Sequence, residues 1–268
     1  MIFPRKRLIK PRLGARINKG HPLAKGLVGY WLMNEGTGNT VQDLSLNNNI
    51  GTLVSDVIWQ PGKFGPALYF TGVTDYITVP DNGTLRFNSA TQDFTISVWV
   101  NTLNEGAQYV IGKMEASDDG WRVLMAGGVV WFSVDDADVK GVTNIADGKW
   151  HHITAVANRP GNGQVYIDGV ADGAPVSLTV AGAMDTTTPM IIGTIPYATN
   201  SSEYVGLMDN ISIDNRALSA SEVAQLYREP FGMFERDEIV LWQPGAGEPP
   251  TGNAGIMTTW GGHWGATY

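Results

Sequence analysis

The chain has 268 residues, with 33 glycines, 14 prolines and no cysteine. The absence of thiols excludes disulfides, zinc–thiolate sites, cysteine nucleophiles and cysteine-ligated iron–sulfur clusters. Only 16% of the residues are charged, and few charges combined with many turn-forming residues favour an all-β fold over a helical one.

Charge divides the chain unequally. Residues 1–25 carry eight Lys and Arg and no acid, whereas the remainder carries ten Lys and Arg and 26 Asp and Glu, so a +8 segment precedes a −16 body. The chain contains no run of 18 apolar residues, and no membrane-spanning segment is expected. The N-terminus also lacks the apolar run of a secretory signal. With three prolines and no strand or helix period, residues 1–25 are predicted to form an extended basic arm.

Apolar alternation begins at Gly26. In the run TISVWV, residues 95–100, apolar side chains occupy both faces, as in a central strand that is covered on both sides. The pair Asp168-Gly169 between two apolar runs indicates a tight hairpin. Runs spaced 8 to 15 residues apart predict an antiparallel sandwich or barrel. The predicted strands are 26–33, 67–71, 75–79, 94–101, 108–113, 121–126, 129–134, 150–158, 163–168, 190–193 and 204–214.

One helix is predicted, over residues 219–228. Ser219 is a suitable N-cap, and Glu222 three residues later completes a capping box. Leu218 and Val223 are spaced to form a hydrophobic staple, and Pro230 ends the run.

The end of the chain is rich in large aromatic side chains, namely Trp242, Trp260, Trp264 and Tyr268. Such side chains are usually buried, so we expect this tail to be covered by the sandwich or by a partner. The predicted organisation is a basic arm (1–25), a sandwich domain (26–228) and an apolar Gly- and Trp-rich tail (229–268).

Eight segments in fixed order resemble the laminin-G-like jelly roll of the concanavalin A-like lectin/glucanase superfamily. The resemblance spans residues 26–228 and implies two antiparallel sheets packed face to face, often with one bound calcium ion. The stretch LYREPFGMFERDEIVLW that follows the helix also resembles tails of viral members of the family. The segments are GLVGYWLMNEGTG, QDLSLNNNIGTL, GKFGPALYFTGVTDYITVP, DFTISVWVN, DGKWHHITAV, VYIDGV, IIGT and YVGLMDNISIDNRALSASEVAQLY.

A structural calcium ion is the best-supported metal. Calcium takes six to eight hard oxygens, often from turns, and the resemblance implies a ligand within a Gly-x-x-Asp pattern on a late strand, here Asp209. The early loop DLSLNNNIG offers Asp43, Asn47 and Asn49, and Asp75 is a further candidate. The alternative is that Asp209 only caps a strand and the others only form turns.

Catalysis is not expected. Glucanases of the superfamily carry Glu-x-Asp-x-x-Glu, which is missing here, and Asp135, Asp136 and Asp138 are predicted to form a turn. His151 and His152 are neighbours on a strand, where their side chains point to opposite faces. Neither a Gly-x-Ser-x-Gly elbow nor a phosphate-binding loop is present, although a Ser-His-Asp arrangement stays open from sequence alone.

Four aromatic residues are candidate platforms for a glycan: Trp59, Trp121, Trp131 and Tyr197. The alternative for each is burial in the core. The basic arm has few aromatics for base stacking, and the body is acidic, so no nucleic-acid partner is expected. The arm is predicted to bind an acidic protein neighbour, or else to fold back on its own body.

The sequence therefore predicts a non-catalytic structural or binding module of a larger, oligomeric assembly. The expected assembly is a virion, as a fibre or capsid decoration made in the host cytoplasm, with subunits joined through residues 1–25 and 230–268. The alternative is a bacterial carbohydrate-binding or adhesion module that is secreted or held at the cell surface.

Overall fold

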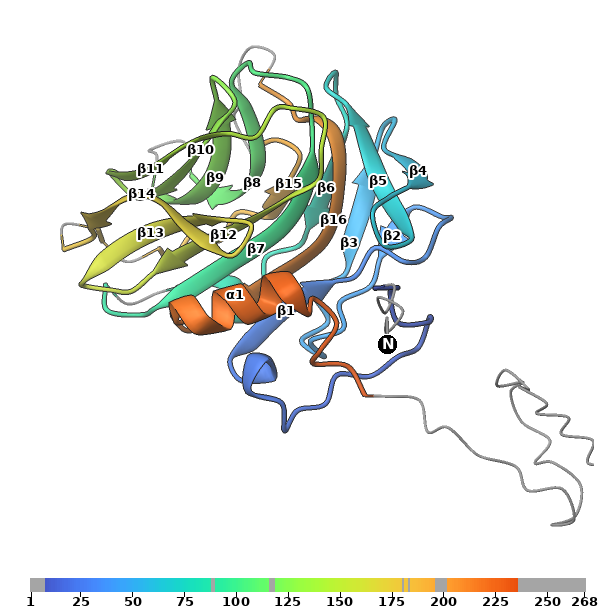
Figure 1. Cartoon of the computed structure of the whole chain (residues 1–268), viewed down its shortest axis with the longest axis horizontal. Helices are drawn as coiled ribbons and strands as arrows, with labels where there is room; N and C mark the ends of the chain where they lie inside the picture. The colour runs from blue at the N-terminus through green and yellow to red at the C-terminus, as the bar shows by residue number, and fades with distance from the viewer. Residues whose placement is uncertain are drawn as a thin grey trace, which may run out of the picture. The chain divides into compact units, whose positions relative to one another are not determined.

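The computed structural model describes residues 8–235, apart from 88–89, 116–118, 180, 183 and 196–201. Two sheets lie face to face, with a short helix in front of one of them (Figure 1). One compact unit ends at Phe234, and the chain from Glu235 on is a separate unit. Within the described residues, no helix is long and apolar enough to cross a membrane.

The first sheet has the strand order β14-β13-β12-β7-β16-β5-β4, with β1 pairing with the end of β16, and all pairs are antiparallel. Its strands are β1 (Leu27–Trp31), β4 (Ile58–Pro61), β5 (Pro66–Thr71), β7 (Phe94–Asn101), β12 (His151–Ala157), β13 (Asn162–Ile167), β14 (Val170–Ser177) and β16 (Val205–Asp214).

The second sheet has the order β11-β10-β9-β8-β15-β6-β3-β2 and is also antiparallel throughout. Its strands are β2 (Thr40–Val41), β3 (Gly51–Val54), β6 (Tyr76–Val79), β8 (Gln108–Met114), β9 (Gly120–Ala126), β10 (Val129–Val134), β11 (Ala137–Asn144) and β15 (Met190–Ile192).

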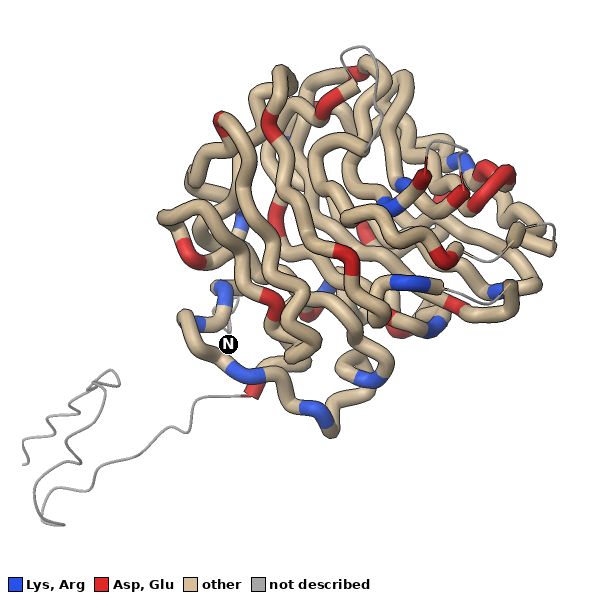
Figure 2. Tube along the Cα trace, turned by 180° about the vertical axis from the view of Figure 1, so that it is seen from behind, with Lys and Arg blue, Asp and Glu red and all other residues tan. Residues whose placement is uncertain are grey.

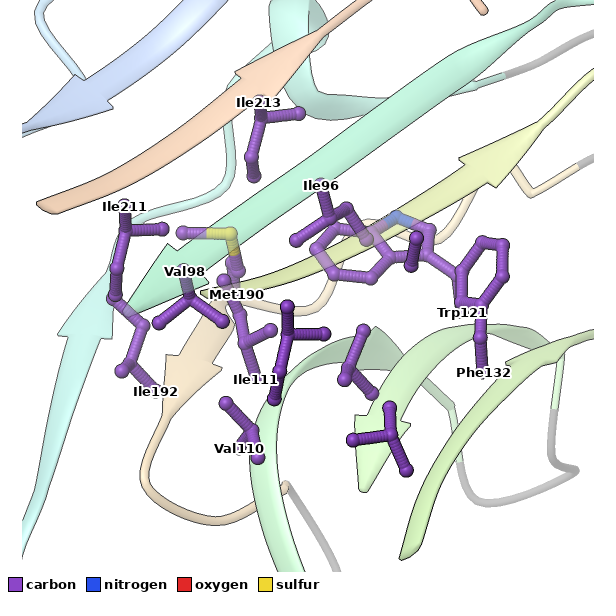
Figure 3. Close-up of a cluster of buried hydrophobic side chains, with 14 of the residues drawn as sticks. Ile96, Val98, Val110, Ile111, Trp121, Phe132, Met190, Ile192, Ile211 and Ile213 are labelled. Atoms are coloured by element: carbon purple, nitrogen blue, oxygen red, sulfur yellow. The ribbon is translucent and has the colours of Figure 1, made fainter. Parts of the chain in front are cut away.

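The main core fills the space between the sheets. Alternate side chains of each strand point inward, so Ile96 and Val98 of β7 meet Ile111, Trp121 and other residues of the second sheet (Figure 3). Every predicted strand is present within one or two residues of its expected ends, including the first, which spans Leu27–Trp31 of the predicted 26–33. The jelly-roll sandwich is thereby confirmed.

Five strands were not predicted: β2, β3, β4, β11 and β14. Their sequences are short or contain Gly, Pro, Asp and Lys, which local preference places in turns. The predicted acidic turn is correct only for Asp135 and Asp136, because Asp138 lies on β11. Val139 on the same strand is buried in the core, and this tertiary contact outweighs the polar neighbours.

The single α-helix of the described region is α1 (Ala220–Arg228). Ser219 is its N-cap, and Glu222 closes the predicted capping box. Helix α1 lies across the outer face of the first sheet (Figure 1), where Val223 and Leu226 pack against Tyr30 and Val156.

Residues 8–25 lie along their own body, which is the alternative that the sequence left open for the basic arm, and a protein neighbour stays a prediction. Asn18 N–H donates to the Met233 carbonyl at 2.8 Å, and Ile17 forms a β-bridge with Phe234. A short 3₁₀ helix, η1 (Pro22–Ala24), follows. Arg216 Nε donates to the carbonyl of Lys25 at 2.7 Å. The basic residues of this N-terminal segment therefore lie at one end of the domain (Figure 2).

Candidate functional site

The outer face of the first sheet is covered over its central strands, whereas the edge strands β4 and β14 are largely exposed. Helix α1, residues 8–25 and residues 229–234 cover the central strands and share a second hydrophobic core with them. Beneath the helix, the Trp99 ring stacks on Tyr227 with centroids 5.5 Å apart and makes a tilted contact with His152, with centroids 4.9 Å apart. The buried members of this second core are Leu23, Tyr30, Leu32, Val156, Leu218, Val223, Leu226, Met233 and Phe234.

A lysine ammonium lies in an oxygen-lined socket under this cover. Lys10 Nζ pairs with the buried carboxylate of Asp209 and donates to the carbonyls of Met33, at 2.8 Å, and Pro66. Burial raises the pKa of Asp209 to about 7, an effect that the Lys10 charge opposes. Burial also lowers the pKa of Lys10. The ammonium thus occupies the cation position that the sequence assigned to calcium at Asp209.

The early-loop candidates are held by the loop itself. The Asp43 carboxylate accepts the backbone N–H groups of Tyr30, Ser45 and Asn49 at 2.8–3.0 Å. The side-chain amides of Asn47 and Asn49 both donate to one carbonyl of β1, at 3.0 and 2.8 Å. These contacts are those of a turn that anchors the loop to β1.

Asp75 organises a different turn. Its carboxylate accepts from the backbone of Thr71, from Thr71 Oγ1 at 3.0 Å, and from the N–H groups of Gly72 and Val73, each at 3.1 Å. The predicted ligands therefore have separate partners, and the described residues contain no group of three or more His, Asp or Glu placed to hold a metal ion. These residues do not fit a shared calcium site, and calcium stays a prediction.

One Ser–His contact lies in the covered face. Ser97 Oγ is 2.6 Å from His152 Nε2, the geometry that a nucleophilic serine requires. Burial lowers the pKa of His152 to about 3, and its Nδ1 has no hydrogen-bond partner in the described part of the chain. Both side chains are buried, so a substrate has no route to them, and the pair is a packing contact.

A surface cavity of about 640 Å³ lies where the N-terminal segment meets the β4–β5 hairpin. Its wall is mostly apolar, with Leu8 and Ile9 on one side and Trp59 and Phe64 among the hairpin residues, and Lys63 is the charged group that lines it. Trp59 is held by a 2.9 Å hydrogen bond from its Nε1 to the Gly38 carbonyl. The cavity is formed where the N-terminal segment packs against the β4–β5 hairpin.

The outer face of the second sheet has a different character. A row of side chains crosses it on four neighbouring strands: Tyr109 on β8 opposes Leu124 on β9, which opposes Trp131 on β10, which opposes Lys140 on β11. Tyr109, Leu124 and Trp131 are half-buried, and Lys140 is exposed. We call these four residues the outer row. Their strand neighbours point into the core, so the row faces outward.

A β-bulge sets the end of the outer row. The register of β10 against β11 shifts between Val129 and Trp131, and without that shift Val142 would oppose Trp131. The bulge instead places Lys140 there, with its Nζ 3.6 Å from the centroid of the Trp131 ring. Bulges often re-aim side chains in this way, and the result is an ammonium that lies over the face of the Trp131 ring.

The four predicted glycan platforms differ in where they lie in the structure. Trp121 is 1% exposed and belongs to the core, and Tyr197 lies outside the described residues. Trp59 lines the hairpin cavity, and Trp131 lies in the outer row. Sequence reasoning missed the other members of the row, because their alignment depends on strand register, although strand alternation alone already separates Trp131 from Trp121.

A family profile described as the concanavalin A-like lectin/glucanases superfamily matches residues 71–224. Among curated proteins, the chain is 28% identical over 203 residues to a non-toxic nonhemagglutinin of Paraclostridium bifermentans, covering 71% of this chain and 16% of that protein. It is 27% identical over 202 residues to botulinum neurotoxin type G of Clostridium botulinum, covering 67% and 15%. The chain thus spans about a sixth of the length of these relatives.

Solved structures show the same fold. The binding domain of Paraclostridial Mosquitocidal Protein 1 superposes with a TM-score of 0.66 at 23% identity, over 78% of this chain and 53% of that one. The binding domain of botulinum neurotoxin serotype G superposes with a TM-score of 0.61 at 20% identity, over 76% and 51%.

Proposed function

Because the chain belongs to the concanavalin A-like lectin/glucanase superfamily, we propose that it is a non-catalytic binding module that attaches a larger assembly to a sugar-bearing surface. One observation carries the proposal. The chain covers the outer face of the first sheet with its own segments, and the outer row lies on the outer face of the second sheet. Sugar-binding surfaces commonly combine aromatic side chains with a few polar groups.

Two further observations support this proposal. The similar solved structures are described as binding domains. The superfamily's paired catalytic acids have no counterpart in the sequence, and the Ser97–His152 contact is buried. General acid–base catalysis needs groups within reach of a substrate, and this pair is not.

The test is a glycan array probed with the wild-type protein and with Trp131→Ala. We expect binding to a subset of sugars that Trp131→Ala weakens by about ten-fold or more, as truncation of a central aromatic anchor does. A panel of β-glucans and chromogenic glycosides should show no turnover. An array without wild-type binding, or turnover abolished by a single Asp or Glu substitution, would contradict the proposal.

The assembly that we propose is a virion, in which the module is a fibre or a capsid decoration. The resemblance of the segment after α1 to viral tails supports it, as do the aromatic residues between 242 and 268, which lie outside the described region. The alternative is a secreted or cell-surface protein. Mass spectrometry of purified particles and of the secreted fraction separates the two, because the chain should be found in only one of them.

A further inference from the structure

We infer that the ligand of the outer row is a sugar that carries a carboxylate, and that Lys140 selects it. The inference rests on the proposed function, because it names the class of ligand for the same surface. It begins with the ammonium of Lys140, which lies 3.6 Å from the centroid of the Trp131 ring. That distance is well within the range of a cation–π contact.

The ammonium is held only loosely in this position. The Lys140 side chain is 47% exposed, and its Nζ is 3.9 Å from the Asp138 carboxylate. Asp138 also accepts a 2.6 Å hydrogen bond from Ser133 Oγ, so this carboxylate is shared. Exposed ion pairs of this kind contribute little, and Lys140 is free to move when a ligand arrives.

A sugar that stacks on Trp131 from the solvent side meets this ammonium first. A neutral sugar displaces Lys140 and loses the cation–π contact without replacement. A sugar with a carboxylate gives the displaced ammonium a new ionic partner. The two attractions are of similar size, so the carboxylate offsets the loss and the neutral sugar is disfavoured.

The experiment uses an array of matched pairs, each a uronic acid oligosaccharide and its methyl ester, with tetragalacturonate as the first pair. The variants are Lys140→Met, Lys140→Arg as the conservative rescue, and Lys149→Met as the control. Lys149 is an exposed lysine that pairs with Asp147 away from the row. Melting temperatures check that each variant is folded.

We expect the wild type to bind the acid about three- to ten-fold more tightly than the ester. Lys140→Met should remove most of that preference by weakening binding of the acid, whereas Lys140→Arg and Lys149→Met should keep the preference. Equal wild-type affinity for acid and ester, or a preference that survives in Lys140→Met, overturns the inference and leaves the binding function intact. An array on which no sugar binds overturns the proposed function itself.

Discussion

The two outer faces of the sandwich differ in what covers them and in what lies on them. On the first sheet, α1 and the terminal segments enclose a layer of polar and ionisable side chains that includes Ser97, His152, Asp209 and Asp214. On the second sheet, the outer row lies on the outward face, and its Lys140 ammonium covers the Trp131 ring and meets solvent. The comparison indicates that the terminal segments decide which face of this fold is available to a ligand.

Substitutions on the two faces should therefore have different effects, on stability for the first sheet and on binding for the second. Polar groups under a cover are expensive to leave without partners, so changes to the covered face should mainly destabilise the fold. Side chains of the open face have little packing to lose, so changes there should mainly weaken binding.

The largest expected effect on stability comes from Lys10→Met. The substitution leaves the Asp209 carboxylate buried without its ionic partner, and breaking a buried pair from one side costs about 3–5 kcal/mol of unfolding free energy. Urea unfolding measures it. The control Lys19→Met removes an exposed lysine of the same segment and should change stability by less than about 0.5 kcal/mol.

The double variant Lys10→Met with Asp209→Asn sharpens this test. Replacing both charges removes the unpaired carboxylate, so most of the lost stability should return. A single variant as stable as the wild type, or a double variant no more stable than the single one, would show that the Lys10–Asp209 ion pair does not anchor the N-terminal segment.

A pair of leucines compares the two faces directly. Leu226→Ala opens a cavity in the second core, where Leu226 is 4% exposed, and should lower the unfolding free energy by about 2–4 kcal/mol. Leu124→Ala in the half-buried outer row should lower it by about 1 kcal/mol. Equal losses would contradict the distinction between a covered and an open face.

The pH dependence of stability reports on Asp214. Burial raises the pKa of this carboxyl from 3.8 to about 8 in the folded state. Below about pH 4 the Asp214 carboxyl is protonated in both the folded and the unfolded state, so the full contribution of this group to stability is present there. This contribution is lost as the pH rises towards 8, since the unfolded state then releases the proton.

Asp214→Asn cannot titrate and should escape this loss. The stability of the variant relative to the wild type should rise steadily between pH 4 and pH 8, measured by urea unfolding at each pH. Parallel pH profiles for the two proteins would mean that Asp214 does not titrate in this window.

The smallest expected effect is that of a chelator. Because Lys10 pairs with Asp209, EDTA should shift the wild-type melting temperature by less than about 1 °C. Lys10→Ala leaves the carboxylate and two carbonyls without a cation, so calcium should stabilise this variant more than the wild type. A clear loss of wild-type stability on chelation would favour the calcium ion that the sequence predicts.

The sequence is sufficient to predict the elements whose signals are local. Alternation located β7 and β16, and Ser219 and Glu222 located the start of α1. Strands such as β11 and β14 depend on tertiary pairing, and their polar residues conceal them.

The candidate site was predictable only in part. A cation at Asp209 was expected, but Lys10 is 199 residues away in a Pro-rich segment, and no local pattern links the two. Trp131 was identified as a candidate platform. Its neighbours Tyr109 and Lys140 align with it only because bulges in β8 and β11 set the register, and single-sequence patterns do not reveal bulges.

The central claim is that the open face of the second sheet recognises the ligand. The most direct test is isothermal titration of the sugar that binds best on the array against Trp131→Ala and Trp59→Ala. Trp59 is the matched control, because it is also half-buried but lines the hairpin cavity beside the N-terminal segment. We predict that Trp131→Ala loses about ten-fold or more in affinity and that Trp59→Ala binds like the wild type. A loss in Trp59→Ala with unchanged binding by Trp131→Ala would contradict the account.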